Sequence, residues 1–331
     1  MTITARLPMP FGWYCIGYSD ELAPEEVRIV RYFNREMVLF RTESGDLGLV
    51  KPICPHLGAH LGHGGTVVGE SIRCPFHHWA YDTEGRVTDV PYATALPPKA
   101  SKGPCLGTWP VQERSGVIWA WYHPENSPPS FEPEDHPEIG HADWVPTDRY
   151  EWEFRGHPQE IAENGVDVAH FKYVHNMDAV PEGETLYDGY VRSSRISGPR
   201  RFIGPDGQEQ VIESRVEVRQ VGAGQKVTRF SGLVDTLLLV LVTPIDEERV
   251  HLRFAFTHKH YEEGSFEHRA CQESIQSVIG QRGVAGDIPI WEHKEHVRTP
   301  MLCDGDGPIM RFRRYFAQFY VNGPYGDQPR Q

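Results

Sequence analysis

The sequence predicts a small all-β domain followed by a larger α+β domain, and three observations support this. The chain has 331 residues, 39% hydrophobic and 24% charged, which suits a globular protein with two cores. Short strand-like runs separated by turn residues continue to about residue 125, and five prolines lie between 124 and 137. We therefore expect a lead-in over 1–10, an all-β domain over 11–130, and a domain over 131–331 with an antiparallel sheet flanked by helices.

In the first predicted domain, β-branched and aromatic residues mark strands at 27–33, 37–41, 47–51, 80–81, 86–90 and 117–122. Turn residues such as Ser44-Gly45-Asp46 separate them. The stretch 54–77 lacks a strand pattern and is rich in glycine, so it predicts loops whose backbone can fold close to a bound group. The last run, 117–122, predicts a buried closing strand.

The second predicted domain alternates helical and strand-like patterns. Helices are expected at about 158–171 and 265–282, and strands at 144–154, 189–196, 211–221, 225–230, 233–243 and 250–258. In the last strand every second residue is apolar (Val250, Leu252, Phe254, Phe256), which predicts one buried sheet face. Residues 308–322 form a basic and aromatic run.

Composition argues against several classes of protein. The net charge is −13 and no basic stripe is present, so a nucleic-acid partner is not expected. The longest apolar run, 237–242, is too short to span a membrane, and the first twenty residues lack a signal pattern. The six cysteines lack disulfide-framework spacing, so Cys15, Cys105, Cys271 and Cys303 are expected to be reduced thiols of a cytoplasmic protein.

Two compact Cys/His pairs predict a metal site in the first domain. They are Cys54-Pro55-His56 and Cys74-Pro75-Phe76-His77. Two thiolates and two imidazoles can hold a structural zinc or a [2Fe–2S] cluster with two histidines on one iron. Zinc sites more often pair cysteine with cysteine and histidine with histidine, so mixed pairs favour the cluster. A red-brown colour separates the two, since zinc is colourless.

A second cluster of candidate ligands lies at 163–175. On a helix Asn164, Asp167 and His170 would share one side. His175 lies five residues after His170, about 500° around a helix, so both reach one metal only if the helix ends or distorts between them. Two histidines and a carboxylate form the facial triad of non-haem Fe(II) oxygenases. Taken alone, these two histidines would be interpreted as ordinary surface or core residues among seventeen. An upstream iron–sulfur cluster needs an electron acceptor, however, so the two motifs together favour an iron site here.

With both motifs in this order, the sequence resembles the oxygenase (alpha) subunit of Rieske non-haem iron oxygenases. The resemblance implies a homotrimer or trimer-based assembly in which electrons pass from the cluster of one subunit to the iron of the next. It implies that Asp167, with Asn164 beside it, belongs to the catalytic machinery, and that Asp167 bridges His170 to His77 of the partner subunit. It also implies a Rieske [2Fe–2S] cluster and a mononuclear Fe(II), whose ligands would be Cys54, His56, Cys74 and His77 for the cluster and His170 and His175 for the iron.

The third iron ligand has to come from downstream. Asp287, which follows the helical segment at 265–282, is the expected ligand, as in this family. Glu292, Asp304 and Asp306 are rivals, although Asp304-Gly305-Asp306-Gly307 looks more like a turn.

Residues 287–291 and 306–320 carry a finer resemblance, to 3-ketosteroid 9α-hydroxylases and cholesterol 7-desaturases. It implies an apolar steroid substrate, O2 and a monooxygenase reaction. Without this resemblance, residues 311–314 would be interpreted as an ordinary solvated face with aromatic packing. Electrons from NAD(P)H would arrive through a separate reductase, directly or via a ferredoxin, since no Gly-x-Gly-x-x-Gly precedes a helix. A local basic patch could serve docking: Arg73, Arg86, Lys99 and Lys102.

Other interpretations stay open from sequence. A Rieske-type electron carrier explains 11–125 but gives the second domain no purpose. A zinc-stabilised binding protein would take up no O2. Desaturation, demethylation or ring dihydroxylation would need the same ligands as hydroxylation, and a further small subunit would not show in this chain.

Overall fold

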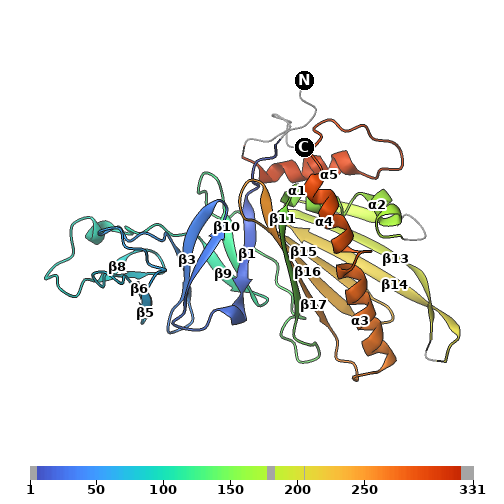
Figure 1. Cartoon of the computed structure of the whole chain (residues 1–331), viewed down its shortest axis with the longest axis horizontal. Coiled ribbons are helices and arrows are strands. Elements are labelled where there is room, and N and C mark those ends of the chain that lie inside the picture. Colours follow the sequence, from blue (N-terminus) through green and yellow to red (C-terminus); the bar gives the residue numbers. More distant parts are fainter. Residues whose placement is uncertain (1–5, 177–182, 205, 322–331) are drawn as a thin grey trace. The chain divides into compact units, whose positions relative to one another are not determined.

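The computed structural model describes residues 6–176, 183–204 and 206–321, which divide into two compact units (Figure 1). Residues 13–132 form one unit, and the residues on both sides of them form the other. The start of the chain thus packs with its far end. The Phe11 backbone N–H donates to the Phe319 carbonyl at 2.8 Å, and the two rings meet edge to face.

The first unit consists of three small antiparallel sheets, as the predicted all-β class requires. One sheet contains β1 (Gly12–Tyr18), β10 (Val117–Tyr122) and β9 (Val111–Arg114), and another contains β2 (Val27–Tyr32), β3 (Arg35–Arg41) and β4 (Leu47–Val50). The third contains β5 (Thr66–Val68), β6 (Ser71–Arg73), β7 (Ala80–Asp82) and β8 (Val87–Asp89). Short 3-10 turns lie at Ser19–Glu21 and Ala100–Lys102.

The core of this unit includes two of the candidate metal ligands. Cys54 and Cys74 are each 2% exposed and pack with Phe40, Leu61 and Tyr81. Burial of apolar side chains around the two loops therefore fixes the position of both sulfur atoms.

The second unit contains a seven-stranded antiparallel sheet in the order β11-β17-β16-β15-β14-β13-β12. Its strands are β11 (Asp148–Arg155), β12 (Glu184–Asp188), β13 (Val191–Ile203), β14 (Glu209–Val221), β15 (Gln225–Ser231), β16 (Thr236–Pro244) and β17 (Arg249–His258). The helices are α1 (Pro158–Glu163), α2 (Val168–Tyr173), α3 (Phe266–Ile279), α4 (Val284–His293) and α5 (Ile309–Phe316), with a 3-10 turn at Ala317–Phe319.

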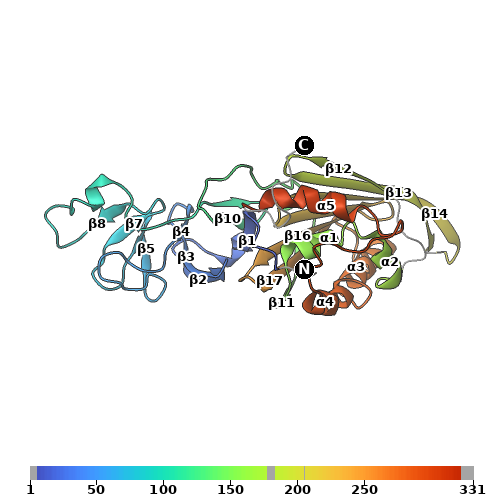
Figure 2. The same ribbon diagram turned by 90° about the horizontal axis from the view of Figure 1, so that it is seen from above.

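One face of this sheet packs against helices, which forms the α+β architecture expected from sequence (Figure 2). The alternating residues Val250, Leu252, Phe254 and Phe256 are all buried in one cluster, as predicted. The helices supply its other side, from Ile161 of α1, Ile275 of α3, and Val284 and Trp291 of α4.

Two element predictions in this unit were wrong. The helix expected over 158–171 is interrupted, because α1 ends at Glu163 and α2 begins only at Val168. The segment that carries Asp287 is helix α4, which sequence reasoning did not assign; Pro289 inside it hides the pattern. Elsewhere the short strands β1, β5, β6, β9 and β12 were missed, since runs of three to seven residues give little periodicity.

A buried ion pair joins α1 to α5 just before the candidate iron ligands. Arg313 donates from Nε and Nη2 to the two carboxylate oxygens of Glu163, at 2.6 Å and 2.8 Å. Both side chains are at most 7% exposed, and Nη1 also donates to the Val297 carbonyl. The predicted solvated face of 311–314 is therefore only half right: Arg311 and Arg314 are exposed, whereas Arg313 is buried.

We expect Arg313→Met to lower the free energy of unfolding by about 3–5 kcal/mol, because it leaves the Glu163 carboxylate buried without a counter-ion. Urea denaturation measures this. Arg195→Met is the matched control, since Arg195 pairs with Glu217 while 67% of its side chain is exposed, and its loss should cost less than about 1 kcal/mol. Equal stability of the two variants would contradict a structural role for the buried pair.

Candidate metal centres

The two Cys/His loops of the first unit share one backbone design. The Cys54 N–H donates to the Ala59 carbonyl and the Cys74 N–H to the Trp79 carbonyl, each at 2.8 Å. Four residues after each cysteine the chain turns through a left-handed conformation, at Gly58 (φ 81°) and His78 (φ 60°). Each loop is thereby closed on itself, and its cysteine and histidine are held at neighbouring positions.

The four candidate ligands converge, with the cysteines inside and the histidines toward the surface. The His56 and His77 rings are half-buried with centroids 4.8 Å apart, and His56 stacks on Trp79 at 4.5 Å. Burial raises the pKa of the Cys74 thiol, the backbone N–H of Phe76 opposes this rise, and the neighbouring Cys54 thiol adds to it.

These donors fit a [2Fe–2S] cluster. Nδ1 of His77 is buried without a hydrogen-bond partner among the described residues, which is costly unless the atom binds something. Two thiolates on the core side and two imidazoles on the outer side match the Cys2His2 ligand set of such a cluster. None of the six cysteines forms a disulfide.

Tyr81 contacts the candidate ligand Cys54, and sequence reasoning did not predict this contact. Its hydroxyl lies 3.1 Å from Cys54 Sγ, and its side chain is fully buried. Burial, followed by the hydrogen bond to Cys54, raises the pKa of the Tyr81 hydroxyl. It therefore stays protonated and can donate a hydrogen bond to a thiolate ligand, which is a way to adjust a cluster's potential. Its position seven residues after Cys74, on β7, gave no signal beyond a strand pattern.

In the second unit the helix ends between His170 and His175, as ligation by both requires. α2 stops at Tyr173, and His175 follows its C-cap, Val174. The two rings lie 4.8 Å apart at an interplanar angle of 75°. Burial lowers the pKa of both imidazoles, so the neutral form needed for metal binding is favoured.

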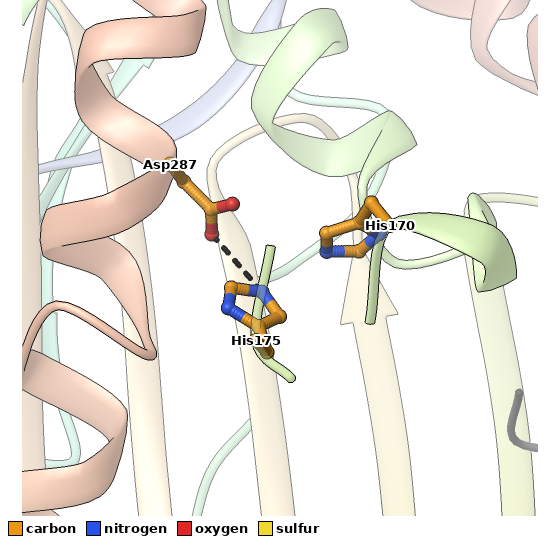
Figure 3. A group of neighbouring side chains, drawn as sticks. All are labelled: His170, His175 and Asp287. Carbon is orange, nitrogen blue, oxygen red and sulfur yellow. Dashed lines mark ion pairs between the residues drawn. The ribbon is translucent and has the colours of Figure 1, made fainter. Parts of the chain in front are cut away.

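Asp287 of α4 completes the group, as Figure 3 shows. Its Oδ2 lies 3.4 Å from His175 Nε2, and one ligand atom from each of Asp287, His170 and His175 lies within 4.8 Å of the others. Burial raises the pKa of Asp287 to about 7, against the opposing effects of Lys226 and Asn164. Two imidazoles and one carboxylate are the donors that a mononuclear Fe(II) takes when it keeps open positions.

The rival acids lie elsewhere. Among the described residues, Asp287 is the carboxylate that groups with the two histidines, and Glu292, Asp304 and Asp306 do not. Asp304 is exposed, and Asp306 accepts a hydrogen bond from the Cys303 N–H at 2.6 Å, which fits the turn expected there. Glu292 lies on α4 but is not in the group.

Asp167 positions His170 through its backbone. Nδ1 of His170 donates to the Asp167 carbonyl oxygen, and because a carbonyl only accepts, Nδ1 carries the proton and Nε2 is left for a metal. The Asp167 carboxylate caps α2 by accepting from the His170 N–H at 3.3 Å, and it retains further lone pairs. The predicted bridge to His77 of the partner subunit involves a second chain and stays a prediction.

Asn164 positions Asp287 rather than sharing a helix side with Asp167 and His170. It is the C-cap of α1, and the break at 164–167 removes the single helix on which that expectation rested. Its amide hydrogen-bonds the Asp287 carboxylate, and its Oδ1 accepts from Trp291 Nε1 at 3.3 Å.

Comparison with known proteins gives two family matches. Residues 12–102 match the Rieske [2Fe–2S] domain, and residues 120–320 match the 3-ketosteroid 9alpha-hydroxylase C-terminal domain. A 3-ketosteroid-9-alpha-monooxygenase oxygenase component of Rhodococcus rhodochrous is 29% identical over 94% of this chain and 80% of its own length. A cholesterol 7-desaturase of Caenorhabditis elegans is 30% identical over 95% of this chain and 78% of its own length.

The crystal structure of dicamba monooxygenase bound to dicamba has the same fold. It superposes with a TM-score of 0.69 over 95% of this chain and 98% of that one, at 18% identity.

We expect Asp287→Ala to lower the affinity for mononuclear iron by more than about a hundredfold while the cluster's visible absorbance is kept, because it deletes one of three ligands. Iron and acid-labile sulfide analysis of the purified protein measures both. Asp304→Ala is the matched control and should retain all iron. Loss of mononuclear iron in the control, with retention in Asp287→Ala, would move the third ligand away from Asp287.

Proposed function

The chain belongs to the Rieske non-haem iron oxygenases with a 3-ketosteroid 9α-hydroxylase C-terminal domain, and from this we propose that it hydroxylates an apolar steroid as the oxygenase component. It would use O2 and electrons that originate from NAD(P)H and arrive through a separate reductase or ferredoxin. The observation that carries the proposal is the convergence of His170, His175 and Asp287 in a chain that also brings two Cys/His loops together.

The chain's own residues prepare the site for that chemistry. When bound, the cluster supplies electrons and the ferrous ion supplies O2 activation, with coordination positions left open for O2 and substrate. The Asp167 carbonyl orients the His170 ring. The Asn164 amide hydrogen-bonds the Asp287 carboxylate, and Trp291 Nε1 donates to Asn164 Oδ1. Trp291 also belongs to the apolar cluster with Val240 and Phe254, so water is excluded from one side of the site.

An apolar substrate is supported by the side chains near the site. Ile161 and Ala162 of α1 and Val240 and Val242 of β16 line one side of a small hollow between helix and sheet, and Gln220, Gln225 and Lys226 are among its other lining residues. Sites that bind apolar ligands typically combine apolar walls with a small number of polar groups that orient the ligand.

Desaturation is the second candidate reaction. The cholesterol 7-desaturase relative is as similar to this chain as the 9α-monooxygenase relative is, and either reaction needs the same three iron ligands. A Rieske-type electron carrier would have no use for the second unit.

An exposed apolar surface around the Cys/His loops supports docking of another protein chain. Its large side chains are 40–65% exposed: Ile53, Leu57, Phe76, Tyr92 and Leu96. Of the four residues of the expected basic patch, Lys99 and Lys102 are exposed, Arg73 is half-buried, and Arg86 is paired with Glu84, so the patch stays a prediction. We propose that this surface meets the reductase and the neighbouring subunit of a homotrimer. The described residues include no helix able to span a membrane.

A turnover experiment tests the proposed function. The holoenzyme should contain about three irons and two sulfides per chain, and with a reductase and O2 it should oxidise a neutral 3-ketosteroid. A product heavier by one oxygen indicates hydroxylation, and a product lighter by two hydrogens indicates desaturation. A fully loaded protein that oxidises no steroid would refute the substrate class while leaving the family assignment intact.

We expect Asp167→Asn to keep all metals and the His170 backbone contact but to lower turnover by a hundredfold or more, because the carboxylate joins two sites. Mixed assemblies test whether those sites lie in different subunits. Asp167→Asn chains, with intact clusters, should restore turnover when assembled with Cys54→Ala chains, which have intact iron sites. Mixtures that remain as inactive as either variant would exclude the bridge to the partner subunit.

A further inference from the structure

Arg192 of β13 is buried with its charge uncompensated. Its relative exposure is 0%, and Nε, Nη1 and Nη2 all lack a hydrogen-bond partner among the described residues. Two other buried arginines each have an acid, Glu163 for Arg313 and Glu151 for Arg253. Arg192 therefore differs from these two buried arginines of the same unit, because no acidic side chain among the described residues pairs with it.

The aromatic side chains around Arg192 are neutral. Its guanidinium lies 5.7 Å from the centroid of the Phe312 ring, and Tyr187 and Tyr315 are the groups whose charge would favour its protonated form. A side chain at Gly165 would meet Nη2 at 2.7 Å, so the guanidinium also fills the space beside the iron-ligand segment. A buried cation without an anion is costly, and a bound anion would remove the cost.

Arg192 belongs to a polar row that crosses the sheet. Strand register places Tyr187, Arg192, Gln220 and Lys226 directly opposite one another on β12 to β15, so their side chains share one face. The Tyr187 hydroxyl and Gln220 Oε1 are also buried without partners among the described residues. Burial, and then the charge of Arg192, lowers the pKa of Lys226 to about 8.

The polar row continues from Lys226 into the apolar core of the second unit. Its next members are Val240 and Phe254, in the helix-covered core. Lys226 pairs directly with Val240 of β16, so it lies at the boundary between the polar row and the helix-covered core. Gln220 and Lys226 also line a small hollow beside α1 and β16, together with Ile161 and Val242.

We propose that Arg192, with Lys226 and Tyr187, binds a carboxylate of the substrate, so that this chain acts on an acidic steroid. A guanidinium donates two parallel hydrogen bonds to a carboxylate, and a lysine and a phenol add donors on its flanks. This inference rests on the proposed function, because it specifies the class of steroid.

Equilibrium binding to the holoenzyme tests the proposal. The probes are 3-oxo-4-cholen-24-oic acid and the corresponding C24 primary alcohol, which differ only in the charged group, and the measurement is isothermal titration calorimetry. The wild type should bind the acid ten- to a hundredfold more tightly than the alcohol. Arg192→Met should lose this preference and keep its affinity for the alcohol, whereas Arg195→Met, an exposed arginine on the same strand, should behave as wild type. Equal wild-type affinities, no binding of the acid, or an unchanged preference in Arg192→Met would overturn the proposal.

Thermal unfolding of the ligand-free protein gives an independent test. Because Arg192 has no acid among the described residues, Arg192→Met should melt at or above the wild-type temperature, whereas Arg313→Met should melt below it. The acid should raise the melting temperature of the wild type but not that of Arg192→Met. A loss of stability in Arg192→Met equal to that in Arg313→Met would mean that the chain itself supplies the anion, and the proposal would be wrong.

The two proposals fail separately. Tight, Arg192-dependent binding of the acid without oxidation of any steroid would refute the reaction and leave the carboxylate site. Oxidation of neutral steroids with no preference for the acid would refute the carboxylate site and leave the reaction.

Discussion

The helix break at residues 164–167 is the constraint on which the candidate iron site depends, since two histidines five residues apart cannot face one point from a continuous helix. Several contacts fix the break. Asp167 caps the new helix with its carboxylate, and the Glu163–Arg313 pair anchors the end of the previous one. Gly307 passes so close that a Cβ there would lie 2.6 Å from the Val166 carbonyl oxygen. The ligand segment is therefore defined from both sides by groups that are not ligands.

The two metal centres are built by different physical means. In the first unit, hydrophobic burial holds the cysteines and short closed loops hold the histidines, so the loops themselves form the site. In the second, the ligands come from separate segments of the chain, and hydrogen bonds orient two of them. A backbone carbonyl orients His170, and an asparagine hydrogen-bonds Asp287. The first site is thus largely local in sequence, whereas the second depends on tertiary packing.

That difference explains what sequence could reveal. The Cys/His loops and the closing strand at 117–122 were predictable because spacing and burial patterns act over a few residues. The need for a helix end between His170 and His175 followed from geometry alone. Helix α4 was not predictable from periodicity, because Pro289 interrupts it, and Asp287 was named by resemblance instead. Tyr81 and Arg192 could not be found at all, since what distinguishes them is the side chain each one meets or lacks.

Two of the candidate iron ligands lie on helices and the third just after the C-cap of one, while the row from Tyr187 to Lys226 lies on strands. Substitutions along the strands can therefore alter the polarity of the surface under the helices without moving a ligand atom. A lineage could retain one catalytic apparatus and exchange the molecules it accepts through a few point changes. Such separable evolution of chemistry and selectivity is what a family with diverse relatives would need.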